Sequence, residues 1–132
     1  RRIYFNYLDS TQPTSSWDKF DSSGFDLVNT PRRGNRKETV DKKLIADLWA
    51  FAWDNSKPDG SGTPCVVLLT GDGDFAYTLN KLRDRGVYCI VIHGLETSVS
   101  SILQDSASVC LDFHTQVLRV KTTKQKLEDP LT

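Results

Sequence analysis

Residues 65–77, CVVLLTGDGDFAY, decide the fold class. Their first five side chains are apolar, and this run has about the right length for a buried parallel strand. The glycines that follow indicate a turn, and residues 74–86 are expected to form a helix that Gly86 ends. A strand that leads through a tight turn into a helix is typical of α/β proteins with parallel sheets.

The turn after this strand carries two carboxylates, Asp72 and Asp74. They are predicted to lie at the carboxyl end of the strand, where open α/β sheets place their ligands. At a separation of about 5 Å, two ionised carboxylates repel each other by about 3 kcal/mol at an effective dielectric constant of about 20. A proton, a cationic side chain or a divalent metal ion must offset that repulsion.

Two interpretations of this acidic turn are open. Asp72 can be a turn residue and Asp74 the N-cap of the following helix, although one Asp would suffice for a cap. Alternatively, both carboxylates bind a hard cation, Mg²⁺ or Mn²⁺, because such ions select oxygen ligands. We favour metal binding. Thr70 is either an ordinary residue at the end of the strand or a supporting residue whose hydroxyl orients a metal-bound water or a ligating carboxylate.

Strands and helices are expected to alternate along the rest of the chain. Further strands are predicted at residues 3–8, 25–29, 87–92 and 108–113, and further helices at residues 38–55 and 98–106, with a helical turn around Trp17 and Phe20. This order predicts an α/β fold with a mainly parallel sheet, right-handed crossovers and flanking helices. A length of 132 residues suits one compact domain, which we place at residues 1–122, followed by a polar tail at residues 123–132.

The helix predicted at residues 38–55 has one apolar face with an acid on each side of it. Its apolar stripe comprises Val40, Leu44, Leu48, Phe51 and Ala52. At about 100° per residue, Asp41 and Asp47 lie about 60° to either side of Leu44, so both acids flank the buried face, an unusual place for Asp. They are either surface acids paired with neighbouring lysines or members of the acidic site, and Asp41, in the first turn, is the stronger candidate.

A basic segment precedes and overlaps the start of this helix. Residues 31–43, PRRGNRKETVDKK, contain six basic and two acidic side chains. The candidates for binding RNA phosphates are Arg32, Arg33, Arg36, Lys37 and Lys43. Such contacts would hold the backbone without reading the base sequence. A solvated surface is the alternative, and the formal net charge of zero means that the net-basic signature of nucleic-acid binding is absent.

Other classes of site are not supported by the sequence. It contains neither the GxxxxGK[ST] phosphate loop nor the GxGxxG fingerprint. It also lacks the DxD motif that a haloacid dehalogenase phosphatase needs after its first strand. Two single histidines, His93 and His114, lie at the ends of predicted strands, and no Ser or Cys is spaced to form a triad with them. We therefore predict structural roles for both histidines.

Cysteine usage and hydropathy indicate a protein of the cell interior. Cys65, Cys89 and Cys110 fall in predicted strands with apolar neighbours, and no CxxC spacing occurs. We interpret them as small buried side chains and not as disulfide partners or zinc ligands. No stretch approaches the roughly 20 apolar residues of a membrane span, and we expect no signal peptide. An intracellular, cytoplasmic protein that binds no membrane is therefore predicted.

Two motifs resemble those of a known family. Residues 70–94, TGDGDFAYTLNKLRDRGVYCIVIHG, and residues 40–47, VDKKLIAD, resemble the NYN domains, a branch of the PIN-like nucleases. Members of that family carry a strand, a Gly-Asp-x-Asp-Phe turn, a helix, a Gly and another strand, with a Val-Asp-x-x-Leu-x-x-Asp helix upstream. The resemblance covers residues 2–113, and residues 70–94 are its most specific part.

The resemblance implies a metal-dependent ribonuclease on a parallel sheet. It implies that Asp41, Asp72 and Asp74 are catalytic acids and metal ligands, with Asp47 as a further metal ligand. The cofactor it implies is Mg²⁺ or Mn²⁺, and the partner is RNA. The alternative is a catalytically weak or inactive NYN-like module that binds RNA or another protein.

One departure from the family pattern favours that alternative. The family's first strand ends in an Asp and lies centrally in the sheet, whereas residues 3–8 resemble its second strand. We therefore expect the first strand to precede Arg1, with Asp9 as the only nearby substitute for its acid. A gap in the sheet would leave unpaired strand edges, which a second copy of this chain or a partner chain can fill.

Overall fold

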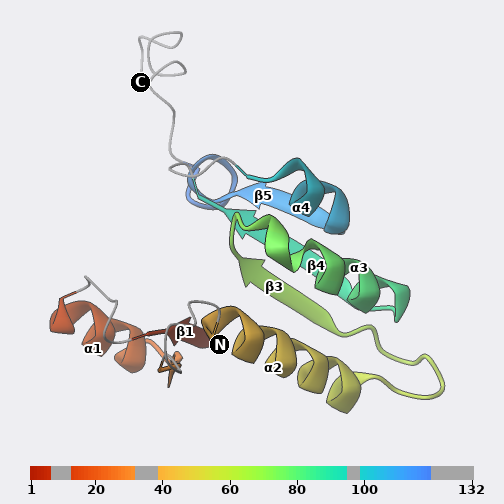
Figure 1. Cartoon of the computed structure of the whole chain (residues 1–132), viewed down its shortest axis with the longest axis horizontal. Coiled ribbons are helices and arrows are strands. Elements are labelled where there is room, and N and C mark those ends of the chain that lie inside the picture. The colour runs from red at the N-terminus through yellow and green to blue at the C-terminus, as the bar shows by residue number, and fades with distance from the viewer. Residues whose placement is uncertain (7–12, 32–38, 95–98, 120–132) are drawn as a thin grey trace, which may run out of the picture. The chain divides into compact units, whose positions relative to one another are not determined.

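The computed structural model describes residues 1–6, 13–31, 39–94 and 99–119. It shows an α/β protein with two parallel sheets flanked by helices (Figure 1). The chain divides into two compact units, Arg1–Ala50 and Phe51–Thr132, and the boundary falls inside one helix. Each unit has its own sheet, and all described strand pairs are parallel, which confirms the predicted fold class.

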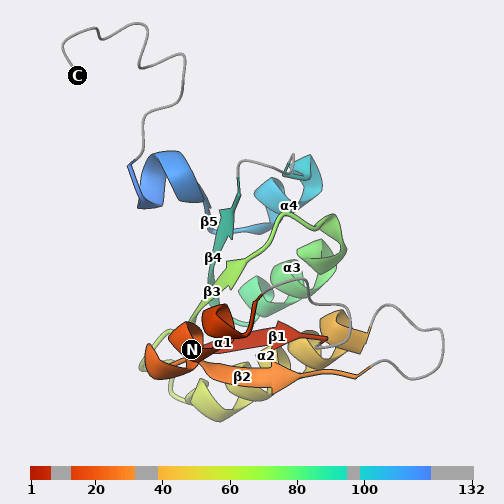
Figure 2. The same cartoon turned by 90° about the vertical axis from the view of Figure 1, so that its left-hand side faces the viewer.

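The first unit contains a β-α-β arrangement. Strand β1 (Arg2–Phe5) pairs in parallel with β2 (Asp26–Asn29), and helix α1 (Thr14–Ser22) connects them in sequence (Figure 2). Strand β2 begins one residue later than the strand predicted at residues 25–29 and ends at the same residue. Of the strand predicted at residues 3–8, the last two residues lie outside the described ranges.

Alternate side chains of β1 contact different helices. The ring of Phe5 stacks on Trp17 of α1 with centroids 4.3 Å apart, and the ring of Phe20 follows at 6.1 Å from Trp17. From the other face of the strand, the hydroxyl of Tyr4 donates a hydrogen bond of 2.6 Å to Asp47. This division follows from the two-residue period of a strand. The aromatic contacts stabilise a nine-residue helix where the sequence predicted only a helical turn.

Helix α2 (Thr39–Asn55) matches the helix predicted at residues 38–55 to within one residue at its start. Its apolar stripe is mostly half-buried, and Phe51 is 39% exposed. Asp41 and Asp47 are also half-buried, which agrees with their predicted places beside the stripe. In the described part of the chain, neither α2 nor any other helix has the length and apolar character needed to cross a membrane.

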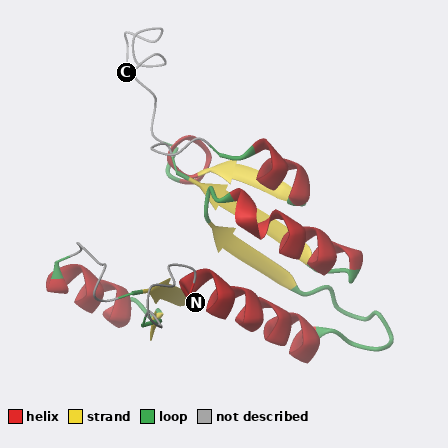
Figure 3. Ribbon diagram, in the orientation of Figure 1, coloured by secondary structure: helices red, strands yellow, loops and turns green. Residues whose placement is uncertain are grey.

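The second unit contains three parallel strands in the order β3-β4-β5 (Figure 3). The strands are β3 (Cys65–Leu69), β4 (Tyr88–His93) and β5 (Val109–Asp112). The helical segments are the 3-10 turn η2 (Gly73–Phe75), α3 (Ala76–Asp84), α4 (Ser101–Ser106) and the π-helix η3 (Phe113–Val117). In Figure 2, α3 and α4 lie on the same side of the sheet. The three strands and α4 were predicted from the sequence, the single helix predicted at residues 74–86 is divided into η2 and α3, and η3 was not predicted.

Burial alternates along β3 because helices cover one face of the sheet. Val66 and Leu68 are 7% and 6% exposed, whereas Val67 and Leu69 are 53% and 66% exposed. The predicted burial of this strand therefore holds for one face. Cys65 lies on the exposed face, so its predicted burial is wrong.

The core of this unit lies between the sheet and α3. Its apolar side chains that are at most 2% exposed are Leu79, Leu82, Val87, Cys89, Val91 and Leu103. The predicted burial of Cys89 is confirmed, and Cys110 is half-buried. A shift of β4 by one residue would turn its buried side chains away from the helices, so this core stabilises the observed register of β3 and β4. That register determines which side chains meet at the carboxyl ends of the strands.

Candidate functional site

The acidic turn directly after β3 is shaped by its own side chains. The backbone N–H of Thr70 donates to the carbonyl of Ile92 on β4 at 3.0 Å, which is the last contact of the strand pairing. The Thr70 hydroxyl accepts the N–H of Asp72 at 3.1 Å, and Oδ1 of Asp72 accepts the N–H of Asp74 at 2.9 Å. Short polar side chains thus take the place of backbone hydrogen bonds, as is usual in tight turns.

Asp72, and not Asp74, is the residue that caps the following helical turn. It precedes η2 with an extended backbone, and its Oδ1 receives the capping hydrogen bond. Both carboxylates are exposed. Among the described residues, no hydrogen bond or ion pair engages Oδ2 of Asp72 or the carboxylate of Asp74. A cap needs one oxygen, so the remaining oxygens of this turn can serve as ligands.

Gly73 allows the start of α4 to approach the turn closely. A Cβ atom at this position would lie 2.7 Å from Oγ and 3.1 Å from Cβ of Ser100. The backbone N–H of Ser100 also points to the carbonyl of Gly71 at 3.4 Å. The glycine between the two acids is therefore explained by crowding against Ser100, and it keeps the acidic turn against the helix.

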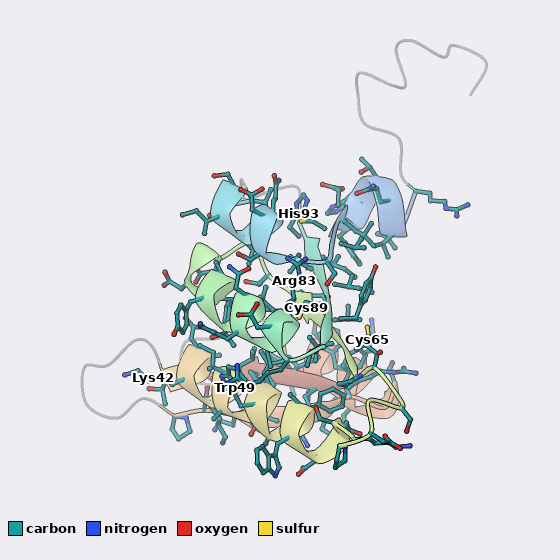
Figure 4. All side chains as sticks on the ribbon, turned by 90° about the vertical axis from the view of Figure 1, so that its right-hand side faces the viewer. Lys42, Trp49, Cys65, Arg83, Cys89 and His93 are labelled. Carbon is teal, nitrogen blue, oxygen red and sulfur yellow. The ribbon has the colours of Figure 1, made fainter. Side chains whose placement is uncertain are left out.

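Two further polar side chains occupy the same edge of the three-stranded sheet. His93 is the last residue of β4, Asp112 is the last residue of β5, and the register pairs them. Nδ1 of His93 lies 3.8 Å from Oδ2 of Asp112, and the side chains are 16% and 17% exposed. Figure 4 labels His93 at the end of its strand. From the sequence, a structural role is predicted for His93, and Asp112 was not among the predicted site residues.

Hydrogen bonds from η3 fix the carboxylate of Asp112. Its Oδ1 accepts the backbone N–H groups of His114 at 3.0 Å and Thr115 at 2.8 Å, and the Thr115 hydroxyl at 3.0 Å. The N–H of Thr115 is the main cause of the lowered pKa of the Asp112 carboxyl, and His93 contributes to it. One signal in the sequence was available, because Asp112 comes directly after the apolar residues Val109, Cys110 and Leu111, much as the acidic turn comes after the apolar residues of β3.

In the first unit, the two acids of α2 have different surroundings. Asp41 lies in the first turn of the helix. Asp47 accepts the hydroxyl of Tyr4 at 2.6 Å and lies 3.4 Å from the guanidinium of Arg2. Burial and the hydrogen bond to Asp47 raise the pKa of Tyr4. Asp47 therefore has protein partners that connect α2 with β1, and its role as a metal ligand stays a prediction.

The predicted RNA contacts lie mostly outside the described residues. This holds for Arg32, Arg33, Arg36 and Lys37. Lys43 is described and is exposed on α2. The structure thus brings Thr70, Asp72 and Asp74 together in one turn of the second unit, and it places Asp41, Lys43 and Asp47 on the helix of the first.

The chain belongs to the NYN domain family. The family model matches residues 1–115, which is most of the chain. The resemblance seen in the acidic turn and in the helix at residues 40–47 is thereby confirmed, and the protein is a member of the PIN-like nuclease superfamily.

A solved structure supports the fold. The crystal structure of a protein of unknown function from Vibrio parahaemolyticus is similar, with a TM-score of 0.62 and 22% sequence identity. The match covers 84% of this chain and 66% of the Vibrio chain, so the present chain spans just under two thirds of that protein's length. No curated protein matches the chain.

Proposed function

We propose that this chain is a ribonuclease domain that binds a divalent metal ion through Asp72, Asp74 and Asp41. One observation carries the proposal: a turn fixed by its own hydrogen bonds presents two exposed carboxylates at the carboxyl end of β3, in a member of a nuclease family. Open α/β sheets bind ligands at this edge. NYN nuclease domains act on RNA and generally depend on a divalent metal ion.

The proposed ligands suit a hard cation. Asp41, Asp72 and Asp74 each offer one carboxylate oxygen, and Mg²⁺ and Mn²⁺ prefer oxygen ligands. The ion also offsets the repulsion within the acidic turn, which is about 3 kcal/mol at a separation of about 5 Å. When bound, it supplies Lewis-acid chemistry at a phosphoryl oxygen and activates water. We leave Asp47 outside this ligand set because it already bonds to Tyr4.

The residues of the chain orient the ligands and the substrate. Oδ1 of Asp72 is held by the N–H of Asp74, which restricts the side chain and leaves Oδ2 for the ion. Thr70 is a positioning residue, because its hydroxyl holds the N–H of Asp72. We further propose that the phosphates of the RNA backbone are contacted by Lys43 and by the predicted basic residues Arg32, Arg33, Arg36 and Lys37.

Cleavage of a labelled RNA in Mn²⁺ or Mg²⁺ tests this function. The parent protein is expected to cleave the RNA, and EDTA is expected to abolish cleavage. Asp72→Asn should reduce the rate by about ten- to a hundredfold or more, because a ligand of the ion is lost. Asp84→Asn, which removes an exposed acid at the end of α3, is the matched control and should retain the parent's rate. Equal rates for Asp72→Asn and the parent would refute the proposal.

A second function, RNA or protein binding without catalysis, is favoured by one observation. The formal net charge is zero, so the overall field does not attract a polyanion, and within this alternative that favours a protein partner over RNA. Salt-sensitive RNA binding without cleavage in any divalent metal would support this alternative. The predicted cytoplasmic location and the predicted partner chain or second copy stay predictions.

A further inference from the structure

The carboxyl edge of the three-stranded sheet carries a row of polar side chains beyond the acidic turn. The register pairs His93 with Asp112, and the pairing of β3 with β4 places Thr70 beside His93 one position beyond Leu69 and Ile92. Matching positions of parallel strands share one face of the sheet. Neighbouring strands lie about 4.8 Å apart, so His93 lies one strand away from the start of the acidic turn.

Asp112 presents one oxygen to His93 in a fixed orientation. Its Oδ1 is occupied by three hydrogen bonds from His114 and Thr115. Its Oδ2 lies 3.8 Å from Nδ1 of His93. Both side chains are more than four-fifths buried, which weakens the screening of this carboxylate by water. The imidazole therefore has a fixed negative charge beside one of its two nitrogens.

A carboxylate at one nitrogen of an imidazole determines what the other nitrogen can do. It favours a proton on Nδ1 and makes Nε2 the nitrogen that exchanges protons with a substrate. The proposed metal site contains no such group, because ionised carboxylates only accept hydrogen bonds. Both histidines of the chain lie at this edge, His93 at the end of β4 and His114 in η3, and Nδ1 of His93 is the ring nitrogen that lies beside Oδ2 of Asp112.

We propose that His93 is a catalytic residue that donates its Nε2 proton to the leaving oxygen of an RNA phosphodiester, with Asp112 as its positioning residue. This inference rests on the ribonuclease function proposed above. A water oxygen bonds to phosphorus while the bond from phosphorus to the leaving ribose oxygen breaks. The attacking water releases a proton to solvent, the leaving oxygen takes the Nε2 proton, and the imidazole regains a proton from solvent.

A substrate with sulfur in place of the leaving oxygen isolates this step. A thiolate leaves without a proton because thiols are far more acidic than alcohols. In Mn²⁺, His93→Gln is expected to cleave ordinary RNA about 10²- to 10⁴-fold more slowly than the parent. The same variant should cleave the sulfur-bridged RNA at close to the parent's rate. Asp84→Asn, at an exposed position at the end of α3, is the control and should behave as the parent on both substrates.

The outcomes separate this inference from the proposed function. If the parent cleaves neither substrate in any divalent metal, the ribonuclease function itself is wrong and His93 has no reaction to serve. If the parent cleaves both and His93→Gln is unimpaired on ordinary RNA, only the role of His93 is overturned. An equal loss on both substrates also overturns it, because that result indicates a structural role.

Nitrogen NMR of the imidazole shows which ring nitrogen of His93 carries the proton, and it needs no metal or substrate. The chain contains two histidines, so His93→Gln assigns the two ring spectra. The neutral ring of His93 is expected to carry its proton on Nδ1, and Asp112→Asn is expected to shift that preference toward Nε2. A neutral ring protonated on Nε2 in the parent would contradict the pairing with Asp112.

Discussion

Asp112 is the single residue whose ionisation is most clearly tied to the fold. Its carboxyl pKa is lowered from the usual 3.8 by hydrogen bonds from η3 and by His93. A lowered folded-state pKa contributes stability above the unfolded-state value, and that contribution is lost as the pH falls through the folded-state pKa. Asp112→Asn should therefore be less stable than the parent at neutral pH.

The lowered pKa of Asp112 also predicts that the parent and Asp112→Asn lose different amounts of stability in acid. As the pH falls from about 6 to about 2.5, the free energy of unfolding, measured with urea, should decrease less for Asp112→Asn than for the parent. Asp84→Asn controls for the loss of one exposed negative charge. Parallel pH profiles for Asp112→Asn and the parent would show that the hydrogen bonds from η3 do not stabilise the ionised form.

The place of an individual residue in the structure could be predicted where its immediate neighbours in the sequence determine it. Asp72 and Asp74 follow an apolar strand and a glycine directly, so their place at the edge of the sheet could be inferred. The partnership of Asp47 with Tyr4 could not, because the two residues are 43 positions apart and only the folded first unit brings them together. The pairing of His93 with Asp112 could not be predicted for the same reason, since it depends on the register of β4 and β5.

At the scale of elements, the type and order of the helices and strands could be predicted from the sequence better than the burial of their side chains. The strand at residues 65–69 was predicted with its observed bounds, because an apolar run between turn residues is a strong local pattern. Its exposed face was not predicted, because exposure depends on which side of the sheet the helices cover. The π-helix after β5 was missed because its start is fixed by the side chain of Asp112.

The contact between the acidic turn and α4 gives a prediction about these elements. Gly73→Ala should lower the free energy of unfolding by about 1–3 kcal/mol, because the new methyl group meets Ser100 at 2.7–3.1 Å. Denaturant unfolding measures the change. Ser100→Gly in the same chain should restore most of the loss, since it removes both crowding atoms. A Gly73→Ala protein as stable as the parent, or a double variant with Ser100→Gly no more stable than Gly73→Ala alone, would show that Ser100 does not crowd this position.

At the scale of the whole molecule, the family and fold class were predictable from two short motifs. The acidic turn and the helix at residues 40–47 led to the NYN family, and the family match over residues 1–115 confirms it. The sequence predicted a mainly parallel sheet with a gap, and the described strands form two separate parallel sheets. The division of the strands between two sheets could not be predicted, because the pairing of strands that are distant in the chain leaves no local pattern in the sequence.

The central claim is that acids from α2 and from the turn after β3 bind one divalent ion. Titration of Mn²⁺ into the purified chain, followed by calorimetry, tests it most directly. Asp41→Asn, Asp72→Asn and Asp74→Asn should each weaken Mn²⁺ binding by about tenfold or more, whereas Asp84→Asn should bind as the parent does. Unchanged Mn²⁺ affinity in Asp41→Asn would contradict the account, because the helix and the turn would then not share an ion.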